Sequence, residues 1–151
     1  MRSMTLADFA NWPQPDGNAP DAVPAALRAL GLAHDAASSL EAYDRFLWAI
    51  GNNHAGTYHP VVLAALPALH EILRNGHPWA RHAALQSLID LDGPFVPEAG
   101  FELHDGLPVQ PALRAAIQAM RPEVARLADA AEDLVAAAAA ELLDTIDDLA
   151  R

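Results

Sequence analysis

The sequence contains no cysteine, no lysine and no long apolar run. Without cysteine, the chain has no disulfide framework, no thiolate metal site and no cysteine nucleophile. The longest apolar stretch, Leu134 to Ala140, has seven residues, whereas a membrane-spanning helix needs roughly 20. The start of the chain has no apolar run of the kind that a secretory signal carries, so we expect a cytoplasmic protein.

Positive charge is also scarce. Nine arginines stand against 20 carboxylates, which gives a formal charge of −11. This charge argues against a nucleic-acid backbone or an anionic membrane surface as the partner. Apolar residues, in contrast, make up 52% of the chain, a content that excludes a disordered protein. The length of 151 residues fits one domain, and we expect a single domain over residues 1–151.

Apolar residues recur at steps of three and four along most of the chain, a spacing that is typical of amphipathic helices. Ser38 and Glu41 have the spacing of a capping box and predict the start of the second helix. Pro67 lies inside the third helix and predicts a kink, and Pro122 predicts a break or a restart. The helices are expected over residues 21–30, 38–50, 60–75, 78–92, 111–120 and 129–150.

Residues 95–108 break this pattern and predict an irregular loop insert. Asp105-Gly106 is a turn signal, which leaves room for a small hairpin, although Pro97 and the short apolar runs argue against strands. Glu98, Glu102 and Asp105 are candidates for paired carboxylates in acid–base chemistry, and we favour their interpretation as solvated loop acids.

A shift of 54 residues aligns two parts of the chain. Leu66 then meets Met120, Leu88 meets Leu142, and the two interior prolines fall within one residue of register. Each part reads as a helix, a short turn and a second helix, and residues 21–50 form a weaker third copy. Stacked helix pairs of this kind bury an apolar face that only a neighbouring pair covers.

Residues 61–91 resemble a HEAT repeat. The matching features are Pro67 in the first helix, a tight turn, and Arg81 followed by small residues and leucine in the second helix. The turn itself reads Asn75-Gly76-His77 and lacks the aspartate usual in such repeats. The resemblance implies an all-α, HEAT-like α–α superhelix of about three helix pairs, with the loop insert near residues 95–108.

Residues 47–60 are similar to a helix–loop element of small bacterial HEAT-like proteins, some of which look like immunity or interaction proteins of toxin systems. The resemblance implies a protein–protein interaction module without catalysis or cofactor, and within that class a toxin-neutralising immunity protein that acts by occlusion. Between Asp129 and Asp148 lie seven carboxylates and no arginine, so we expect a basic protein partner. The candidate binding residues are Asn53, His54 and Tyr58 in the loop and Trp79, Arg81 and His82 on the inner helix.

Two alternatives stay open. The seven histidines, with carboxylates such as Asp90, suggest a metal-dependent hydrolase, since zinc takes His and carboxylate ligands. No spacing enforces such a site, and His70-Glu71 fails the HExxH motif because Arg74 holds its fifth position. A third reading is a HEAT protein that binds a small ligand or repairs nucleic acid, and the acidic charge argues against the latter.

Overall fold

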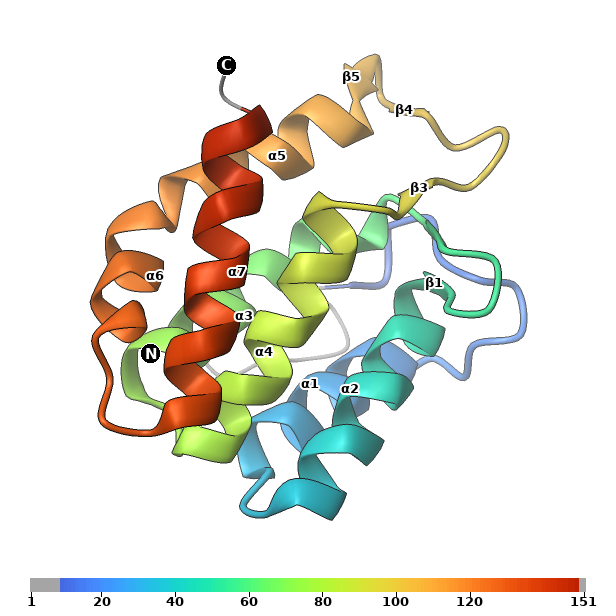
Figure 1. The fold of residues 1–151 in the computed structure, drawn as a ribbon. Coiled ribbons are helices and arrows are strands. Elements are labelled where there is room, and N and C mark those ends of the chain that lie inside the picture. The colour runs from blue at the N-terminus through green and yellow to red at the C-terminus, as the bar shows by residue number, and fades with distance from the viewer. Residues whose placement is uncertain (1–8, 150–151) are drawn as a thin grey trace.

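The computed structural model describes residues 9–149, and helices account for most of them (Figure 1). The expectation of a mainly helical protein is confirmed. In this part of the chain the seven helices are α1 (Ala22–Leu32), α2 (Ala36–Ile50), α3 (Val61–Asn75), α4 (Pro78–Asp92), α5 (Val109–Ala119), α6 (Arg121–Ala128) and α7 (Asp133–Leu149).

The helices form two layers. Helix α4 packs between α2 and α7, and these three make the α2–α4–α7 layer. Helix α3 packs against α1, α5 and α6, which together make the α1–α3–α5–α6 layer. The three helices of the first layer run in the same direction, so their first turns lie at one end of the molecule (Figure 1). Contacts between α1 and α2, α3 and α4, and α6 and α7 join the two layers.

One continuous apolar core lies between the layers, and α4 contributes buried apolar residues to it along most of its length. Leu85, Leu88 and Leu91 are buried on this helix, and so are Ala80, Ala83 and Ala84. Because the distance between packed helices depends on the side chains at their contact, these alanines allow close neighbours. The central position of α4 follows from a helix that is apolar on more than one side.

Helix α2 begins one turn earlier than the sequence predicts. Its capping box consists of Asp35 and Ser38, with the Ser38 N–H donating to Asp35 Oδ1 at 2.8 Å and the Asp35 N–H donating to the Ser38 hydroxyl at 3.2 Å. The predicted pair of Ser38 and Glu41 was wrong. An aspartate caps as well as a serine, and the spacing alone did not distinguish the two.

Two prolines lie where helices begin, and a third lies inside a helix. Pro78 and Pro122 lie in the first turns of α4 and α6, where the missing N–H costs no helical bond. Pro67 lies inside α3, which runs unbroken from Val61 to Asn75. Helix α7 begins at Asp133, four residues after the predicted start at Asp129.

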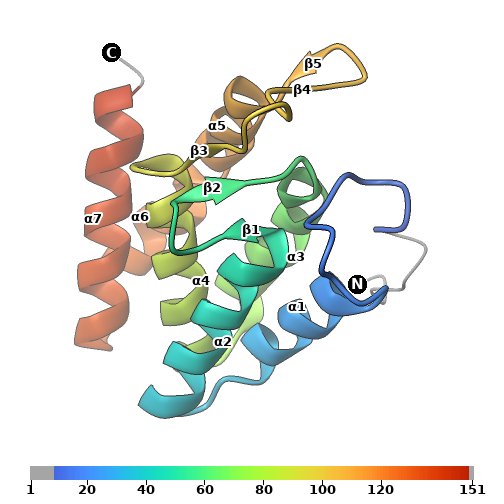
Figure 2. The same cartoon turned by 90° about the vertical axis from the view of Figure 1, so that its right-hand side faces the viewer.

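Short strands occur where only loops were expected. Strands β1 (Gly51–Asn52) and β2 (Thr57–Tyr58) form an antiparallel pair, and β3 (Val96–Pro97) pairs in parallel with β2 (Figure 2). Gly51 approaches β2 closely: a Cβ atom at this position would lie 2.1 Å from the Thr57 carbonyl oxygen. Only glycine therefore fits where α2 passes into β1.

Residues 95–108 hold a hairpin as well as β3. Strands β4 (Leu103–His104) and β5 (Leu107–Pro108) are antiparallel. Asp105 and Gly106 connect them with φ values of 50° and 79°, the left-handed conformation that a two-residue hairpin turn requires. The His104 ring stacks on Trp12 with 4.6 Å between ring centroids, which fixes the hairpin to the N-terminal loop.

No helix within residues 9–149 is long and apolar enough to cross a membrane.

Candidate functional site

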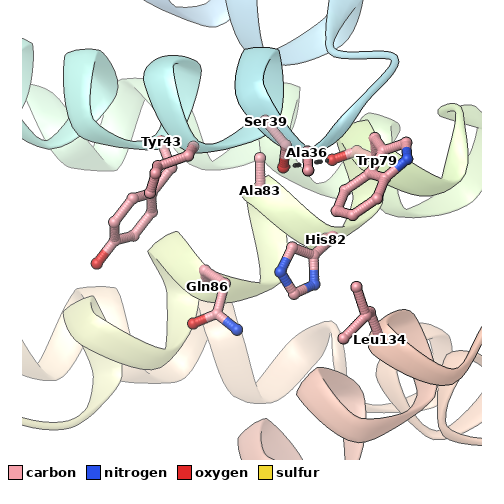
Figure 3. A pocket seen from close by; sticks show the side chains of 9 residues that line it. Ala36, Ser39, Tyr43, Trp79, His82, Ala83, Gln86 and Leu134 are labelled. Carbon is pink, nitrogen blue, oxygen red and sulfur yellow. Dashed lines mark hydrogen bonds between the residues drawn. The ribbon is translucent and has the colours of Figure 1, made fainter.

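A groove crosses the first turns of α2, α4 and α7 (Figure 3). It has a volume of about 350 Å³ and is open to solvent along one side. We call it the interhelical groove. It is lined by Ala36, Ser39, Leu40, Tyr43, Trp79, His82, Ala83, Gln86 and Leu134.

The walls of the interhelical groove are apolar and exposed. Leu40 on α2 is 67% exposed and Leu134 on α7 is 54% exposed, whereas most leucines of this protein are buried. Between them, the Trp79 and His82 rings of α4 meet edge to face with 5.7 Å between centroids. Exposed apolar side chains around a hollow are typical of a binding surface.

Polar groups at the base of the groove are largely bonded to the protein itself. The Ser39 hydroxyl donates to the Trp79 carbonyl oxygen at 2.9 Å (Figure 3), which ties α2 to α4. The Tyr43 hydroxyl donates to the Asp90 carboxylate. Burial and this bond raise the pKa of Tyr43, so the phenol stays protonated at neutral pH.

His82 is the exception among these polar groups. Its Nδ1 atom is buried and has no hydrogen-bond partner in the described part of the chain. The Gln86 side chain faces the hollow beside it (Figure 3).

The two layers carry opposite charge. Helices α2, α4 and α7 contain nine carboxylates and two arginines, a formal charge of −7. Helices α1, α3, α5 and α6 contain two carboxylates and five arginines, a formal charge of +3. The interhelical groove therefore lies on the acidic layer.

The structure brings together two of the three residues predicted on the inner helix. Trp79 and His82 both line the interhelical groove. Arg81 does not, because its guanidinium donates to backbone carbonyls at the end of α3: Nε to Leu73 at 3.0 Å and Nη2 to Arg74 at 2.6 Å. These are carbonyls that a helix end leaves without partners, so Arg81 caps α3.

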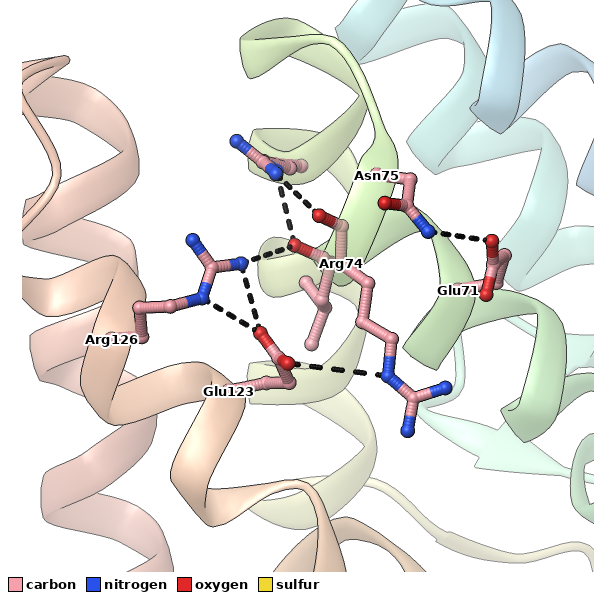
Figure 4. Close-up of polar contacts among 7 residues, drawn as sticks. Glu71, Arg74, Asn75, Glu123 and Arg126 are labelled. Atoms are coloured by element: carbon pink, nitrogen blue, oxygen red, sulfur yellow. Dashed lines mark hydrogen bonds and ion pairs between the residues drawn. The ribbon is translucent and has the colours of Figure 1, made fainter.

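A second arginine reaches the same helix end from α6. Arg126 donates to the Leu73 carbonyl at 3.4 Å and to Glu123 at 2.8 and 3.0 Å, and Glu123 also lies 3.9 Å from Arg74 (Figure 4). This network joins α3 to α6 within the α1–α3–α5–α6 layer.

The predicted loop residues lie at the other end of α2. Asn53 donates to Asp44 at 2.8 Å, and His54 is exposed in the turn between β1 and β2. Tyr58 is fully buried, and burial raises its pKa to about 12. The structure thus separates the six candidate residues into two groups, and none of these three lines the interhelical groove.

Leu40 and Leu134 were not predicted as binding residues, because each continues the three- and four-residue apolar spacing of its helix, which predicts burial. In each case the apolar stripe continues one turn beyond the part that neighbouring helices cover.

Residues 9–149 contain no group of three or more His, Asp or Glu residues that could hold a metal ion. His77, one of the residues considered for such a site, accepts a hydrogen bond from the Trp79 N–H at 3.1 Å and caps α4. The arrangement of these side chains does not support metal-dependent hydrolysis.

Comparison of the chain with protein-family models, curated proteins and solved structures gives no significant match. The chemistry of the surface itself is therefore the basis for the function.

Proposed function

We propose that this chain is a HEAT-like α–α superhelix that acts as a protein-binding module, and that the interhelical groove holds the apolar face of a basic amphipathic helix. The observation that carries the proposal is the pair of exposed leucines, Leu40 and Leu134, on opposite walls of a hollow that also holds Trp79. The expected cytoplasmic location remains part of this proposal.

The two-layer arrangement supports the superhelix. Two successive helix pairs, α1 with α2 and α3 with α4, place one helix in each layer, and a third unit places α5 and α6 in one layer and α7 in the other. The pair formed by α3 and α4 coincides with the segment that resembles a HEAT repeat. Repeated helix pairs present long surfaces that are suited to binding an extended partner.

Charge specifies the partner. The interhelical groove is apolar, but carboxylates dominate the helices around it, with Glu41 beside Leu40 and Asp133 beside Leu134, both exposed. A helix with leucine-like residues on one face and basic residues flanking them meets both demands. The surrounding charge would raise the association rate more than the final affinity.

Occlusion follows from such binding. A partner whose basic surface is also its working surface loses access to its own target while the acidic layer covers it. This is the action of an immunity protein on a toxin, and we propose that role for the chain within the class of binding modules.

A pair of synthetic helices tests the proposal. Fluorescence anisotropy would measure binding to the full chain of an amphipathic peptide of leucine and lysine, and of its counterpart with glutamate in place of lysine. We expect the basic peptide to bind and the acidic peptide to bind at least about tenfold more weakly, a difference of about 1.4 kcal/mol. The affinity for the basic peptide should fall as salt rises.

Variants locate the binding site. Leu40→Ser and Leu134→Ser each remove an apolar contact and should weaken the basic peptide by about tenfold, since burying a leucine contributes about 1.5–3 kcal/mol. Leu32→Ser is the matched control, because Leu32 is 75% exposed on α1 and lies outside the groove. Equal losses in all three variants, or equal binding of the two peptides, would overturn the proposal.

A further inference from the structure

A second pocket lies at the carboxyl end of α2, away from the interhelical groove. Its volume is about 540 Å³, and four separate segments form it: the N-terminal loop, the junction of α2 and β1, the end of β2, and the loop after β3. Its lining includes Asp16, Asn18, Trp48, His59, Glu98 and Phe101.

Aromatic rings form part of its lining. Trp48 is 46% exposed at the end of α2, an unusual exposure for a side chain of this size unless something else covers it. The His59 and Phe101 rings contact each other with 4.6 Å between centroids. The second pocket therefore offers π faces to a ligand.

The charged groups of the second pocket are all negative. Asp16 and Glu98 line it, and no arginine does. Within residues 9–149, neither carboxylate has an ion pair with an arginine. Burial lowers the pKa of His59, so this imidazole is neutral at pH 7 and adds no positive charge.

The backbone holds these groups in place. Glu98 accepts a hydrogen bond from the Thr57 hydroxyl, and its own N–H donates to the Tyr58 carbonyl at 2.8 Å. Asn18 donates to the Ala49 carbonyl at 2.8 Å, which fastens the N-terminal loop to the last turn of α2. The carboxyl end of a helix carries partial negative charge, which adds to that of the two carboxylates.

We propose that the second pocket binds an organic cation, a guanidinium or ammonium group that Asp16 and Glu98 pair with and that Trp48 covers. Carboxylates satisfy the positive charge and its N–H donors, and an indole face attracts a cation by its quadrupole. A guanidinium fits best, since it is planar and presents two donors to one carboxylate. The cation is either a free small molecule or an arginine side chain of a protein.

Matched probes test the charge requirement. The full chain, labelled with ¹⁵N, would be titrated with N-acetylarginine amide and with N-acetylcitrulline amide, which has nearly the same shape without the charge. We expect the arginine compound to shift the Trp48 indole N–H resonance while the resonances of Trp12 and Trp79 stay in place. Equal shifts with the citrulline compound, or no Trp48 shift at about 10 mM arginine compound, would overturn the proposal.

Two variants in the loop after β3 test whether Glu98 is a carboxylate that binds the cation. Glu98→Gln keeps an acceptor for Thr57 but removes the charge, and should weaken the arginine compound at least about tenfold. Glu102→Gln is the matched control, since Glu102 is exposed and does not line the pocket. Equal affinity of Glu98→Gln and the wild type, with both variants folded by circular dichroism, would contradict the assignment.

A third measurement separates the two sources of the cation. If a short peptide that contains the arginine binds more than about tenfold tighter than the amide, the cation belongs to a protein. If agmatine binds as tightly as the peptide, the cation is a free small molecule. The second pocket and the interhelical groove share no lining residue, so each proposal can fail without the other.

Discussion

The α2–α4–α7 layer and the α1–α3–α5–α6 layer face the same core and differ in what they present to solvent. Both bury leucine, alanine and valine on their inner sides. Their helices nevertheless carry formal charges of −7 and +3. Since the demands of the core are alike on both sides, packing does not explain this separation of charge.

The two layers also differ in how their carboxylates and arginines are paired. In the α1–α3–α5–α6 layer, Arg126 and Arg74 are engaged with Glu123 (Figure 4). In the α2–α4–α7 layer, the exposed Glu41, Asp133 and Asp144 have no arginine partner in the described part of the chain. Carboxylates without an arginine partner on this layer agree with the proposed function, in which the acidic layer meets a basic protein.

The largest effect on the free energy of unfolding is expected at Arg81, an arginine of the acidic layer that caps a helix of the other layer. Arg81→Ala leaves the Leu73 and Arg74 carbonyls without this donor. Hydrogen bonds from a charged group contribute about 1.5–3 kcal/mol, so we expect the free energy of unfolding in urea to fall by about that amount.

Arg28→Ala on α1 is the control for Arg81→Ala, because Arg28 is exposed and surface changes away from such contacts stay within about 0.5 kcal/mol. Arg81→Lys should recover little, since a compact ammonium lacks the fixed planar fork whose Nε and Nη2 reach the Leu73 and Arg74 carbonyls together. Equal stability of the two alanine variants would show that Arg81 does not join the layers.

An intermediate effect, and one that depends on pH, is expected at Asp92. This α4 carboxylate is 3% exposed, and burial raises its pKa above the model-peptide value of 3.8. The folded state then holds its proton to higher pH than the unfolded state does, so stability falls as pH rises above about 4. Asp92→Asn should remove this loss and make the protein more stable at pH 7.

Thermal melts of wild type and Asp92→Asn between pH 4 and pH 7 would measure the effect. The two melting temperatures should converge toward the acid end and diverge toward pH 7. Asp144→Asn, an exposed change on α7, should follow the wild type throughout. If the melting temperatures of all three proteins changed with pH in the same way, the titration of Asp92 would not contribute to the pH dependence of stability.

The smallest effect is expected where a surface ion pair joins the layers. Arg121 on α6 holds Asp147 on α7 at 2.9 and 3.0 Å, and both side chains are close to half exposed. Arg121→Gln should lower the melting temperature slightly at low salt, with no difference at about 1 M salt, where screening reaches contact distances. Arg45→Gln on α2 controls for the lost charge, and a difference that persists at high salt would show that the pair acts through packing.

The sequence could predict the helices because their apolar spacing reflects burial directly. It could not predict β1 to β3, since two-residue strands have no measurable period. Their formation depends on the close approach of Gly51 to Thr57, which only a glycine marks in the sequence, and on the long-range pairing of Thr57 with Val96. The start of α2 was misplaced for a related reason: Asp35 and Ser38 both fit a cap, and only the three-dimensional structure selects between them.

The candidate site was partly predictable. Trp79 and His82, two of the predicted binding residues, line the interhelical groove. Leu40 and Leu134 also line it but were not predicted, because periodicity reports which side of a helix is apolar but not where the neighbouring helices stop covering it. Asn53 and His54 lie in the loop between β1 and β2, whereas Asn52 and His59 are the residues of this region that line the second pocket.

Opposite formal charge on the helices of the two layers gives these seven helices together a dipole moment that points from the α2–α4–α7 layer to the α1–α3–α5–α6 layer. If the partner is the proposed basic protein, its field would exert a torque on this dipole that turns the acidic layer forward before any contact is made. Encounters would then begin in one orientation rather than in many. The placement of the arginines would thereby affect the fraction of collisions that lead to binding.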